Sequence, residues 1–305
     1  MKFHRLMPCT HKHGALCLTL FLLLPMGAGA GQIDKIRETH EIVIAHRDAS
    51  IPFSYLDEHK HPIGYSMDLC AKIVSALERE LKLPTITVRY LPVTSATRIS
   101  AIADGLAAME CGSTTNTAER RKKVDYTIAH FISASRLLVR TDTGFNKIED
   151  LEGKTVVSTK GTTNIKTLER VSNERVLKLQ VVEAKDHAEG FSMVQSRQAS
   201  AFAMDDVLLY GLRANAELPE SFKVIGKSMS IEPYAIVLPK DDPAFKKLVD
   251  TEMRRIITSG EIKPLYRKWF EQAIPPKGIN LSLPMPPMLR DSFKYPSDKV
   301  ADVSE

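Results

Sequence analysis

The chain of 305 residues is long enough for two ordinary domains, and its 43% hydrophobic and 26% charged residues are typical of a globular protein. This composition excludes a disordered chain and a fibrous repeat. The formal net charge of +5 is small, and no basic stripe interleaved with aromatic residues indicates nucleic-acid binding.

The first thirty residues have the layout of a secretory signal peptide. Lys2, Arg5 and Lys12 lie in a start without acidic residues, the apolar run 15–24 follows, and the pattern AGA ends at Ala30. The apolar run is too short to span a bilayer, so we expect cleavage after Ala30 and export of a soluble protein. Cleavage removes three basic residues and no acidic residue, which lowers the net charge from +5 to +2.

Two of the four cysteines, Cys9 and Cys17, would leave with this segment, whereas Cys70 and Cys111 remain. An oxidising compartment would permit a disulfide between the remaining pair. The sequence cannot place their Cα atoms within bonding range, and we therefore expect two buried free thiols.

Hydrophobic periodicity predicts alternating strands and helices in the first half of the chain. A short helix ends near His40, the buried strand EIVIAHR follows, and residues 66–83 place apolar side chains at helical spacing, with Ser66 as a candidate N-cap. A strand at 85–91, a helix at 98–106 and a strand at LAAMECG come next. This order indicates a mostly parallel, doubly wound sheet.

The same order restarts further along the chain. LEGKTVVSTKGTTNIKTLERV predicts a turn, a strand, a loop and a helix, and LKLQVVEA and SAFAMDD predict two further strands. The extended runs SRLLVRTD and SIEPYAIVLPKDD flank this second unit and are candidates for two crossings between domains. Helices at 245–259 and 262–270 would complete the first domain, and the Pro-rich tail predicts an extended wrap or a loose end. We expect a signal peptide at 1–30, domain I at 31–137 plus 232–305, and domain II at 138–231.

Polar side chains follow the ends of most predicted strands, where open α/β sheets bind their ligands. They are Arg47, Ser95, Arg98, Ser113, Thr115 and Arg120 in the first unit, and Thr159, Thr162, Asp186, His187 and Asp205 in the second. Each one alone is typical of a cap, a turn or a solvated surface. Together, three arginines, a histidine and several hydroxyls favour an anionic ligand.

The segment ECGSTTNTAERR at 110–121 has two interpretations. Its Ser and Thr residues are good N-cap residues, so the segment can simply begin a helix. Free backbone N–H groups, hydroxyls and Arg120 can instead form a site for a carboxylate or a phosphate. Taken alone, the segment favours the first interpretation.

The chain lacks the usual catalytic signatures GxSxG, HExxH and GxxxxGK[ST], and it has no GxGxxG after a strand. His59 and His61 lie beside a predicted turn, but no further ligand spacing supports a metal site there. His187 next to Asp186 can form an acid-base pair, although without a nucleophile a hydrogen bond to a ligand is the simpler role. We expect neither an enzyme nor a protein with a metal or cofactor.

The order of these blocks resembles that of the bacterial solute-binding proteins for polar amino acids that serve ABC importers. The resemblance runs from Asp34 to the PSDK motif at Pro296 and is carried by HRDASIPFSY, SATR, ECGSTTNTAERR, KGTT, AKDH, AFAMDD and KWFEQAIPPKGINL. It implies a two-lobed periplasmic binding protein fold, in which two doubly wound α/β domains are joined by two hinge strands and close on one amino acid.

The resemblance also implies a role for each candidate residue. The α-carboxylate of a free amino acid would be bound by Arg120 and by backbone N–H groups near Thr115 and Thr162. The ammonium would donate to Asp205 and to oxygens of Ser113 and Thr115. The side-chain carboxylate would meet Arg47, Arg98 and His187, assisted by Ser95 and Thr159, which selects L-glutamate or L-aspartate.

The implied protein is a periplasmic monomer that delivers its ligand to the permease subunits of an ABC importer, without a cofactor or nucleic acid. Two alternatives stay open: an enzyme on the same fold, similar to cyclohexadienyl dehydratase, with Glu110 or Asp205 as the acid, and a sensor module that delivers ligand to a receptor. Ala96 and Thr97 replace a Gln-Asn pair of close relatives, and Lys160 replaces a Ser. These departures leave the class of ligand in place and put the order of glutamate and aspartate in doubt.

Overall fold

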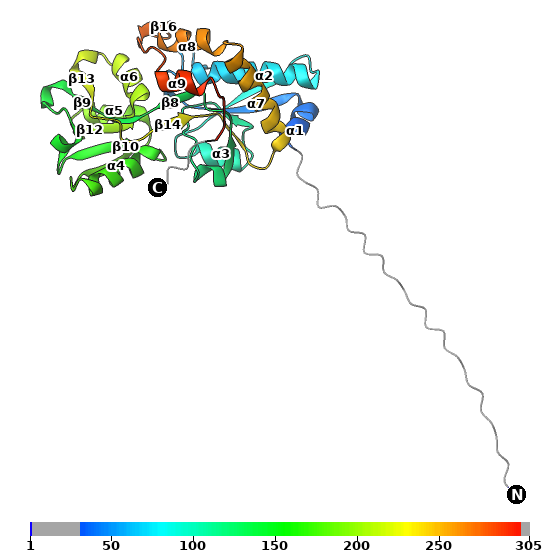
Figure 1. Ribbon diagram of the computed structural model, residues 1–305, viewed down its shortest axis with the longest axis horizontal. Helices are drawn as coiled ribbons and strands as arrows, with labels where there is room; N and C mark the ends of the chain where they lie inside the picture. Colours follow the sequence, from blue (N-terminus) through cyan, green and yellow to red (C-terminus); the bar gives the residue numbers. More distant parts are fainter. Residues whose placement is uncertain (2–30, 300–305) are drawn as a thin grey trace.

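The computed structural model describes residues 1 and 31–299, and over the second range the chain forms two α/β lobes that lie side by side (Figure 1). The expected signal peptide at 1–30 and its cleavage site lie outside the described residues. The two-lobed fold expected from the sequence is confirmed.

The first lobe is built on a five-stranded sheet in the order β5-β1-β6-β15-β7. Its strands are β1 (Glu41–His46), β5 (Thr87–Pro92), β6 (Met109–Glu110), β7 (Val124–Tyr126) and β15 (Val237–Pro239). Its helices are α1 (Gln32–Thr39), α2 (Tyr65–Leu81), α3 (Arg98–Ala103), α7 (Pro243–Thr258), α8 (Ile262–Phe270) and α9 (Pro287–Ser292). The small strands are β2 (Ala49–Ser50), β3 (Ser54–Leu56), β4 (Pro62–Ile63), β16 (Ala273–Ile274) and β17 (Ile279–Asn280), and the 3-10 turn η1 spans Arg120–Lys122.

The second lobe repeats this plan with a five-stranded sheet in the order β11-β10-β12-β9-β13. Its strands are β9 (Ser135–Arg140), β10 (Thr155–Thr159), β11 (Gln180–Ala184), β12 (Ala201–Asp205) and β13 (Phe222–Ile225). Its helices are α4 (Thr163–Glu174), α5 (His187–Gln195) and α6 (Asp206–Ala214), and its 3-10 turns are η2 (Thr141–Thr143), η3 (Ile148–Leu151) and η4 (Pro219–Ser221).

The chain crosses between the lobes on an antiparallel pair of short strands, β8 (Phe131–Ser133) and β14 (Glu232–Tyr234). The first crossing therefore precedes SRLLVRTD, whose residues Ser135–Arg140 form β9 inside the second sheet. Each crossing leads directly into the one strand that runs against its sheet, β9 in the second lobe and β15 in the first. The other strands of each sheet are parallel to one another, so the expected mostly parallel sheets are confirmed.

The crossing strands are anchored in the core of the first lobe. Phe131 of β8 stacks on Phe270 of α8 with ring centroids 5.0 Å apart, and Tyr234 of β14 packs edge-on against Phe53 at 5.1 Å. Such aromatic pairs each contribute about 0.5–1.5 kcal/mol beyond their buried area. The hinge is thereby fixed on the side of the first lobe.

Helix α2 buries the apolar face that the sequence predicts, but it begins differently. Gly64 is its N-cap, and a Cβ there would lie 2.2 Å from the carbonyl oxygen of Phe53, so only glycine fits this close approach. Ser66 lies inside the helix, where its hydroxyl donates to the carbonyl oxygen of Gly112 (2.7 Å). The prediction of Ser66 as the N-cap is therefore wrong, because the hydroxyl serves a long-range contact.

Cys70 and Cys111 form a disulfide with their Cα atoms 6.4 Å apart. The prediction of two free thiols is wrong, because α2 packs on the sheet where β6 ends and brings both side chains together. Residue Cys111 belongs to the segment ECGSTTNTAERR, so the disulfide links this segment to α2.

The Pro-rich tail is an ordered wrap over the first lobe (Figure 1). Leu289 of α9 is fully buried in the core, and the carbonyl oxygen of Asp298 accepts a hydrogen bond from Nδ2 of Asn116 (3.2 Å). Lys277 reaches the second lobe, where Nζ donates to the carbonyl oxygen of Asn215 (2.9 Å). Of the two possibilities for this tail, the structure shows the extended wrap.

Candidate functional site

Arg47 follows β1 and is 2% exposed, with Nε and Nη1 buried and without a hydrogen-bond partner. Its backbone is fixed by Ser54, whose Oγ accepts from the Arg47 N–H (2.9 Å) and donates to the Arg47 carbonyl oxygen (3.3 Å). Burial, followed by the charge of Arg98, lowers the pKa of Arg47 to about 9. The guanidinium stays charged at neutral pH, and its buried N–H groups need hydrogen-bond acceptors, for which an anion is the best match.

Arg98 is the first residue of α3 and is also 2% exposed. Its Nη1 donates to the carbonyl oxygen of Ser113 (3.2 Å), whereas Nε is buried without a partner. Burial, followed by the charge of Arg120, lowers the pKa of Arg98. The hydroxyls of Ser95 and Ser113 are likewise buried and unpartnered, so the first lobe presents several unmet polar groups in one region.

The segment 110–121 does not begin a helix at its Ser and Thr residues. Thr115 forms a bridge with Tyr234 of the hinge, and the N–H of Asn116 donates to the carbonyl oxygen of Pro233 (2.8 Å). The first helical turn is η1, which starts at Arg120. The helix-start interpretation is therefore wrong, because the segment runs along the hinge strand β14.

Arg120 extends from this segment toward the second lobe. Its Nη1 donates to the carbonyl oxygen of Thr115 (2.9 Å), and its Nη2 donates to the carbonyl oxygen of Gly161 (3.0 Å). Gly161 lies in the turn after β10, so one guanidinium contacts both lobes.

The same turn packs against the loop that carries Ser95. A Cβ at Gly161 would lie 2.5 Å from Cα of Ala96 and 2.7 Å from the carbonyl oxygen of Ser95, and Gly161 has a φ of +77°. Only glycine satisfies both requirements. The neighbouring Lys160 is exposed and lies 3.6 Å from Glu183, which directs its ammonium away from the buried groups.

His187, the first residue of α5, is buried in the second lobe, and its Nδ1 lies 2.9 Å from Oγ1 of Thr159. Burial, followed by the charges of Arg47 and Arg98, lowers its pKa well below the usual value, so the ring is neutral. When Nδ1 accepts the hydroxyl proton, the buried and unpartnered Nε2 carries the ring proton and can donate it to an anion. Asp186 caps the helix by accepting from the N–H of Glu189 (2.9 Å), so it does not form an acid-base pair with the ring.

The remaining candidate site residues of the second lobe, Thr162 and Asp205, have hydrogen-bond partners within the protein. Thr162 is the N-cap of α4, and its Oγ1 donates to the carbonyl oxygen of Thr159 (2.7 Å). Asp205, at the end of β12, accepts from Nδ2 of Asn164 (2.8 Å) and from the hydroxyl of Tyr234 in the hinge. Burial, followed by the charge of Glu232, raises the pKa of Asp205 to about 7. The Asp205 carboxylate is thus connected directly to β14.

The sequence analysis named Glu110 only as the acid of an alternative enzyme, and it missed three further residues with buried polar groups here: Asn164, Glu232 and Tyr234. Glu232 accepts from Oγ1 of Thr163 (2.8 Å) and from Ser230. An acidic residue at the end of a buried strand was the available signal for Glu110, whereas the other three depend on the placement of the hinge.

The charges of the gathered residues indicate the kind of ligand that fits. Three arginines, Arg47, Arg98 and Arg120, lie in this region together with three buried acidic residues, Glu110, Asp205 and Glu232. The arginines nevertheless keep buried donors that lack partners, namely Nε and Nη1 of Arg47 and Nε of Arg98. An anion that also carries a donor for Asp205 matches this arrangement.

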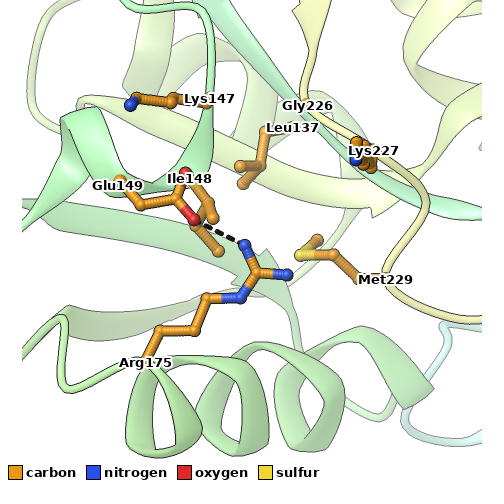
Figure 2. Close-up of a pocket in the computed structure, with 8 residues that line it drawn as sticks. All are labelled: Leu137, Lys147, Ile148, Glu149, Arg175, Gly226, Lys227 and Met229. Atoms are coloured by element: carbon orange, nitrogen blue, oxygen red, sulfur yellow. Dashed lines mark hydrogen bonds and ion pairs between the residues drawn. The ribbon is translucent and has the colours of Figure 1, made fainter.

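A separate pocket of about 360 Å³ lies in the second lobe, between η3, the end of α4 and the loop after β13 (Figure 2). Its floor includes Leu137, and Arg175 at its rim forms an ion pair with Glu149 (2.6 Å). Lys147 and Lys227 at this rim are exposed. The pocket contains none of the predicted site residues and no buried charge, so it is not the candidate site.

Two structural features are absent from residues 31–299. No group of three or more His, Cys, Asp or Glu side chains in this range is arranged to bind a metal ion. His59 and His61 are exposed and lie beside Glu58 and Asp57. In the same range, no helix has the length and apolar character that a membrane crossing requires.

Comparisons with known proteins agree with this architecture. Residues 42–272 match the family model of bacterial extracellular solute-binding proteins, family 3. The L-glutamate/L-aspartate-binding protein of Pseudomonas aeruginosa is 46% identical over 273 residues, which cover 89% of this chain and 90% of the relative. The glutamate/aspartate import solute-binding protein of Escherichia coli is 38% identical over 92% of this chain and 97% of its own length.

Solved structures show the same fold. An arginine-binding protein from T. maritima superposes with a TM-score of 0.67 at 23% identity, covering 78% of this chain and 98% of its own. An ancestral amino acid-binding protein, described as a precursor of cyclohexadienyl dehydratase, gives a TM-score of 0.66 at 25% identity and covers 79% and 100%. The sequence relatives are named as solute-binding proteins rather than enzymes, which supports the expectation of a non-enzymatic role. The chain belongs to the bacterial extracellular solute-binding proteins, family 3.

Proposed function

We propose that this protein captures L-glutamate or L-aspartate between its two lobes and delivers the amino acid to the permease subunits of an ABC importer. The observation that carries the proposal is the pair of buried arginines, Arg47 and Arg98, of which Nε and Nη1 of Arg47 and Nε of Arg98 have no partner in the protein. A ligand with a side-chain carboxylate satisfies these donors, whereas a neutral side chain leaves buried charges unpaired. The names of the two bacterial relatives agree with this choice of ligand.

The proposed ligand lies with its backbone groups toward the hinge. Arg120 and the backbone N–H groups near Thr115 and Thr162 bind the α-carboxylate, and Asp205 accepts from the ammonium together with Ser113 and Thr115. The side-chain carboxylate meets Arg47, Arg98 and His187, with Ser95 and Thr159 beside it. Support for this orientation comes from Arg120, which already donates to carbonyl oxygens of both lobes, and from Asp205, which is connected to β14.

The lobes are expected to close on the ligand because its proposed contacts come from both of them. A ligand that contacts both lobes favours the closed form by the free energy of the contacts that exist only in that form. We propose that the lobes move as two units, residues 31–133 with 232–299 and residues 134–231. This division lies a few residues before the expected boundary at 137, because Ser135–Arg140 form β9 of the second sheet. The rigid packing of Phe131 and Tyr234 supports rotation of the second lobe relative to the first.

The same proposal places the protein in the periplasm as a monomer. Residues 1–30 would act as the signal peptide and be removed after Ala30. Delivery then requires only that the permease recognise the outer surface of the closed lobes. In the alternative role as a sensor module, a receptor would bind the same outer surface in place of the permease.

Isothermal titration calorimetry of the exported chain tests the proposed function. The protein is unfolded and refolded first, which removes any amino acid that was purified with it, and is then titrated with L-glutamate, L-aspartate and L-glutamine. We expect binding of one molecule of either acidic amino acid, with L-glutamine at least about 100-fold weaker because it leaves the buried guanidiniums unpaired. Equal affinity for L-glutamate and L-glutamine, or no binding of either acidic amino acid, would refute the proposal.

A further inference from the structure

Glu110 is a buried carboxylate at the end of β6, with no exposed surface. Its Oε2 accepts a hydrogen bond from Oγ1 of Thr114 (2.6 Å), but its Oε1 is buried and has no partner. A buried charge with an unmet oxygen is costly unless opposite charges lie close to it. Nearby positive charge lowers the free-energy cost of burying this carboxylate.

The arginine pair supplies that charge. A Cβ at Gly112 would lie 2.2 Å from Oε1 of Glu110 and 3.0 Å from Cγ of Arg47, so the carboxylate and the Arg47 stem approach the same point of the backbone. Burial lowers the pKa of Arg47 and of Arg98, and the charge of Glu110 raises both again. Glu110 is thus an electrostatic neighbour of both guanidiniums, although no direct ion pair joins them.

Glu110 changes the charge that a ligand side chain meets. Arg47 and Arg98 alone present two positive charges, and with Glu110 the sum is one. We propose that Glu110 restricts this part of the site to side chains with a single negative charge and disfavours side chains with two. The proposal rests on the proposed function, because it takes Arg47 and Arg98 as the side-chain contacts.

O-phospho-L-serine is a suitable probe, since its phosphate monoester loses its second proton near pH 6 and carries about two negative charges above that pH. The affinities for L-glutamate and O-phospho-L-serine are measured by calorimetry at pH 8 in the wild type and in Glu110→Gln. We expect the ratio of the two affinities to shift toward O-phospho-L-serine by about tenfold or more in the variant, because one negative charge beside the dianion is removed. The larger size of phosphate affects both proteins equally and cancels from the comparison.

Matched variants separate charge from packing. Glu110→Asp keeps the charge, and Thr114→Val keeps the charge while removing the donor to Oε2; both are expected to retain the wild-type ratio. A Glu110→Gln protein that is folded, as judged by its thermal unfolding, but has an unchanged ratio would overturn the proposal. A folded variant that binds neither ligand would also overturn it, because Glu110 would then position the arginines rather than select the charge.

The wild type alone provides a second test if Glu110→Gln does not fold. From about pH 5 to about pH 8 the phosphate monoester gains its second charge. The affinity for O-phospho-L-serine divided by that for L-glutamate is expected to fall over this range, and a constant or rising ratio would contradict the proposal. Wild-type protein that binds no L-glutamate would instead refute the proposed function itself.

Discussion

The two lobes have the same sheet topology but contribute different chemistry to the site. In the first lobe, the polar groups are charged or hydroxyl-bearing, and several are buried without a partner: Nε and Nη1 of Arg47, Nε of Arg98, and Oγ of Ser95 and Ser113. In the second lobe, the corresponding groups are neutral or titrate near neutrality, and most have partners. The first lobe therefore contains the unpartnered donors that favour an anion. In the second lobe, most polar groups already have hydrogen-bond partners that hold them in place.

Because of this difference, we expect the first lobe to determine which ligand binds and the second lobe to couple binding to closure of the lobes. In the proposed function, fixed charges in the first lobe would distinguish ligands by the charge of their side chains, since guanidiniums stay ionised over the physiological range. The second lobe connects its carboxylate, Asp205, to Tyr234 of the hinge, so contacts made there depend on the arrangement of the lobes. Substitutions in the first lobe should consequently change the preference among ligands, whereas substitutions in the second lobe should change how affinity depends on pH.

The largest expected effect comes from Arg120, the residue that contacts both lobes. Arg120→Ala should weaken the binding of every tested amino acid by about 1,000-fold, because removal of one partner of a hydrogen-bonded charge pair costs about 2–5 kcal/mol. Calorimetry with L-glutamate and L-glutamine measures this loss. Lys122→Ala is the matched control, since Lys122 is exposed in the same 3-10 turn and carries the same charge. Wild-type affinity in Arg120→Ala would show that the α-carboxylate lies elsewhere.

The disulfide belongs to the first lobe, and its removal should affect stability more than selectivity. Replacement of Cys70 and Cys111 by Ala should lower the free energy of unfolding by about 3–4 kcal/mol, as expected for a closed loop of this length. The two cysteines are 41 positions apart. Denaturant unfolding without ligand measures the change. A loss below about 1 kcal/mol would mean that packing of α2 on β6 already fixes the segment.

Arg47 tests the assignment of selectivity to the first lobe. Arg47→Met keeps an apolar stem of similar length, and it should reduce the preference for L-glutamate over L-glutamine by about 100-fold because the buried charge is removed. Arg89→Met is a matched control, since Arg89 is an exposed arginine on β5 whose nearest acidic partner is Glu41. An unchanged preference in Arg47→Met would place the side-chain carboxylate away from this guanidinium.

The second lobe should add a pH dependence of smaller size. Burial, followed by Glu232, raises the pKa of Asp205 to about 7, so the carboxyl is protonated in the ligand-free protein below that pH. A bound ammonium favours the ionised form, and binding below this pKa releases a proton. The affinity for L-glutamate should therefore fall as the pH drops below about 7, by up to about tenfold per pH unit.

Glu232→Gln provides the comparison for this effect. Removal of the Glu232 charge lowers the pKa of Asp205, so the loss of affinity should begin at a lower pH. Titrations between about pH 5 and pH 8 in both proteins measure the shift. A profile that is flat in the wild type would show that Asp205 does not bind the ammonium.

Long periodic segments made most of the fold predictable from the sequence. The apolar spacing of 245–259 and 262–270 predicted α7 and α8 closely, and the blocks shared with the family predicted the two lobes. Short extended segments were less predictable, because the sequence of β8 has no periodicity that distinguishes a crossing from an edge strand. The Cys70–Cys111 pairing depended on the same long-range packing and was missed.

The positions of Arg47 and Asp205 at strand ends were predictable from the sequence, and their roles in binding stay predictions. The full burial of Glu110 and the contact of Tyr234 with Asp205 were not predictable, because both depend on long-range packing. The helix-start interpretation of the segment 110–121 failed for a related reason. Hydroxyl-rich sequences favour N-caps and loops alike, and pairing with β14 decided between them.

A crystal structure of the exported chain with L-glutamate would test the central claim most directly. We predict that the side-chain carboxylate lies within hydrogen-bonding distance of Arg47 and Arg98, the α-carboxylate at Arg120, and the ammonium at Asp205. A ligand in the reversed orientation, or one bound in the second-lobe pocket beside Arg175, would contradict the division of roles between the two lobes.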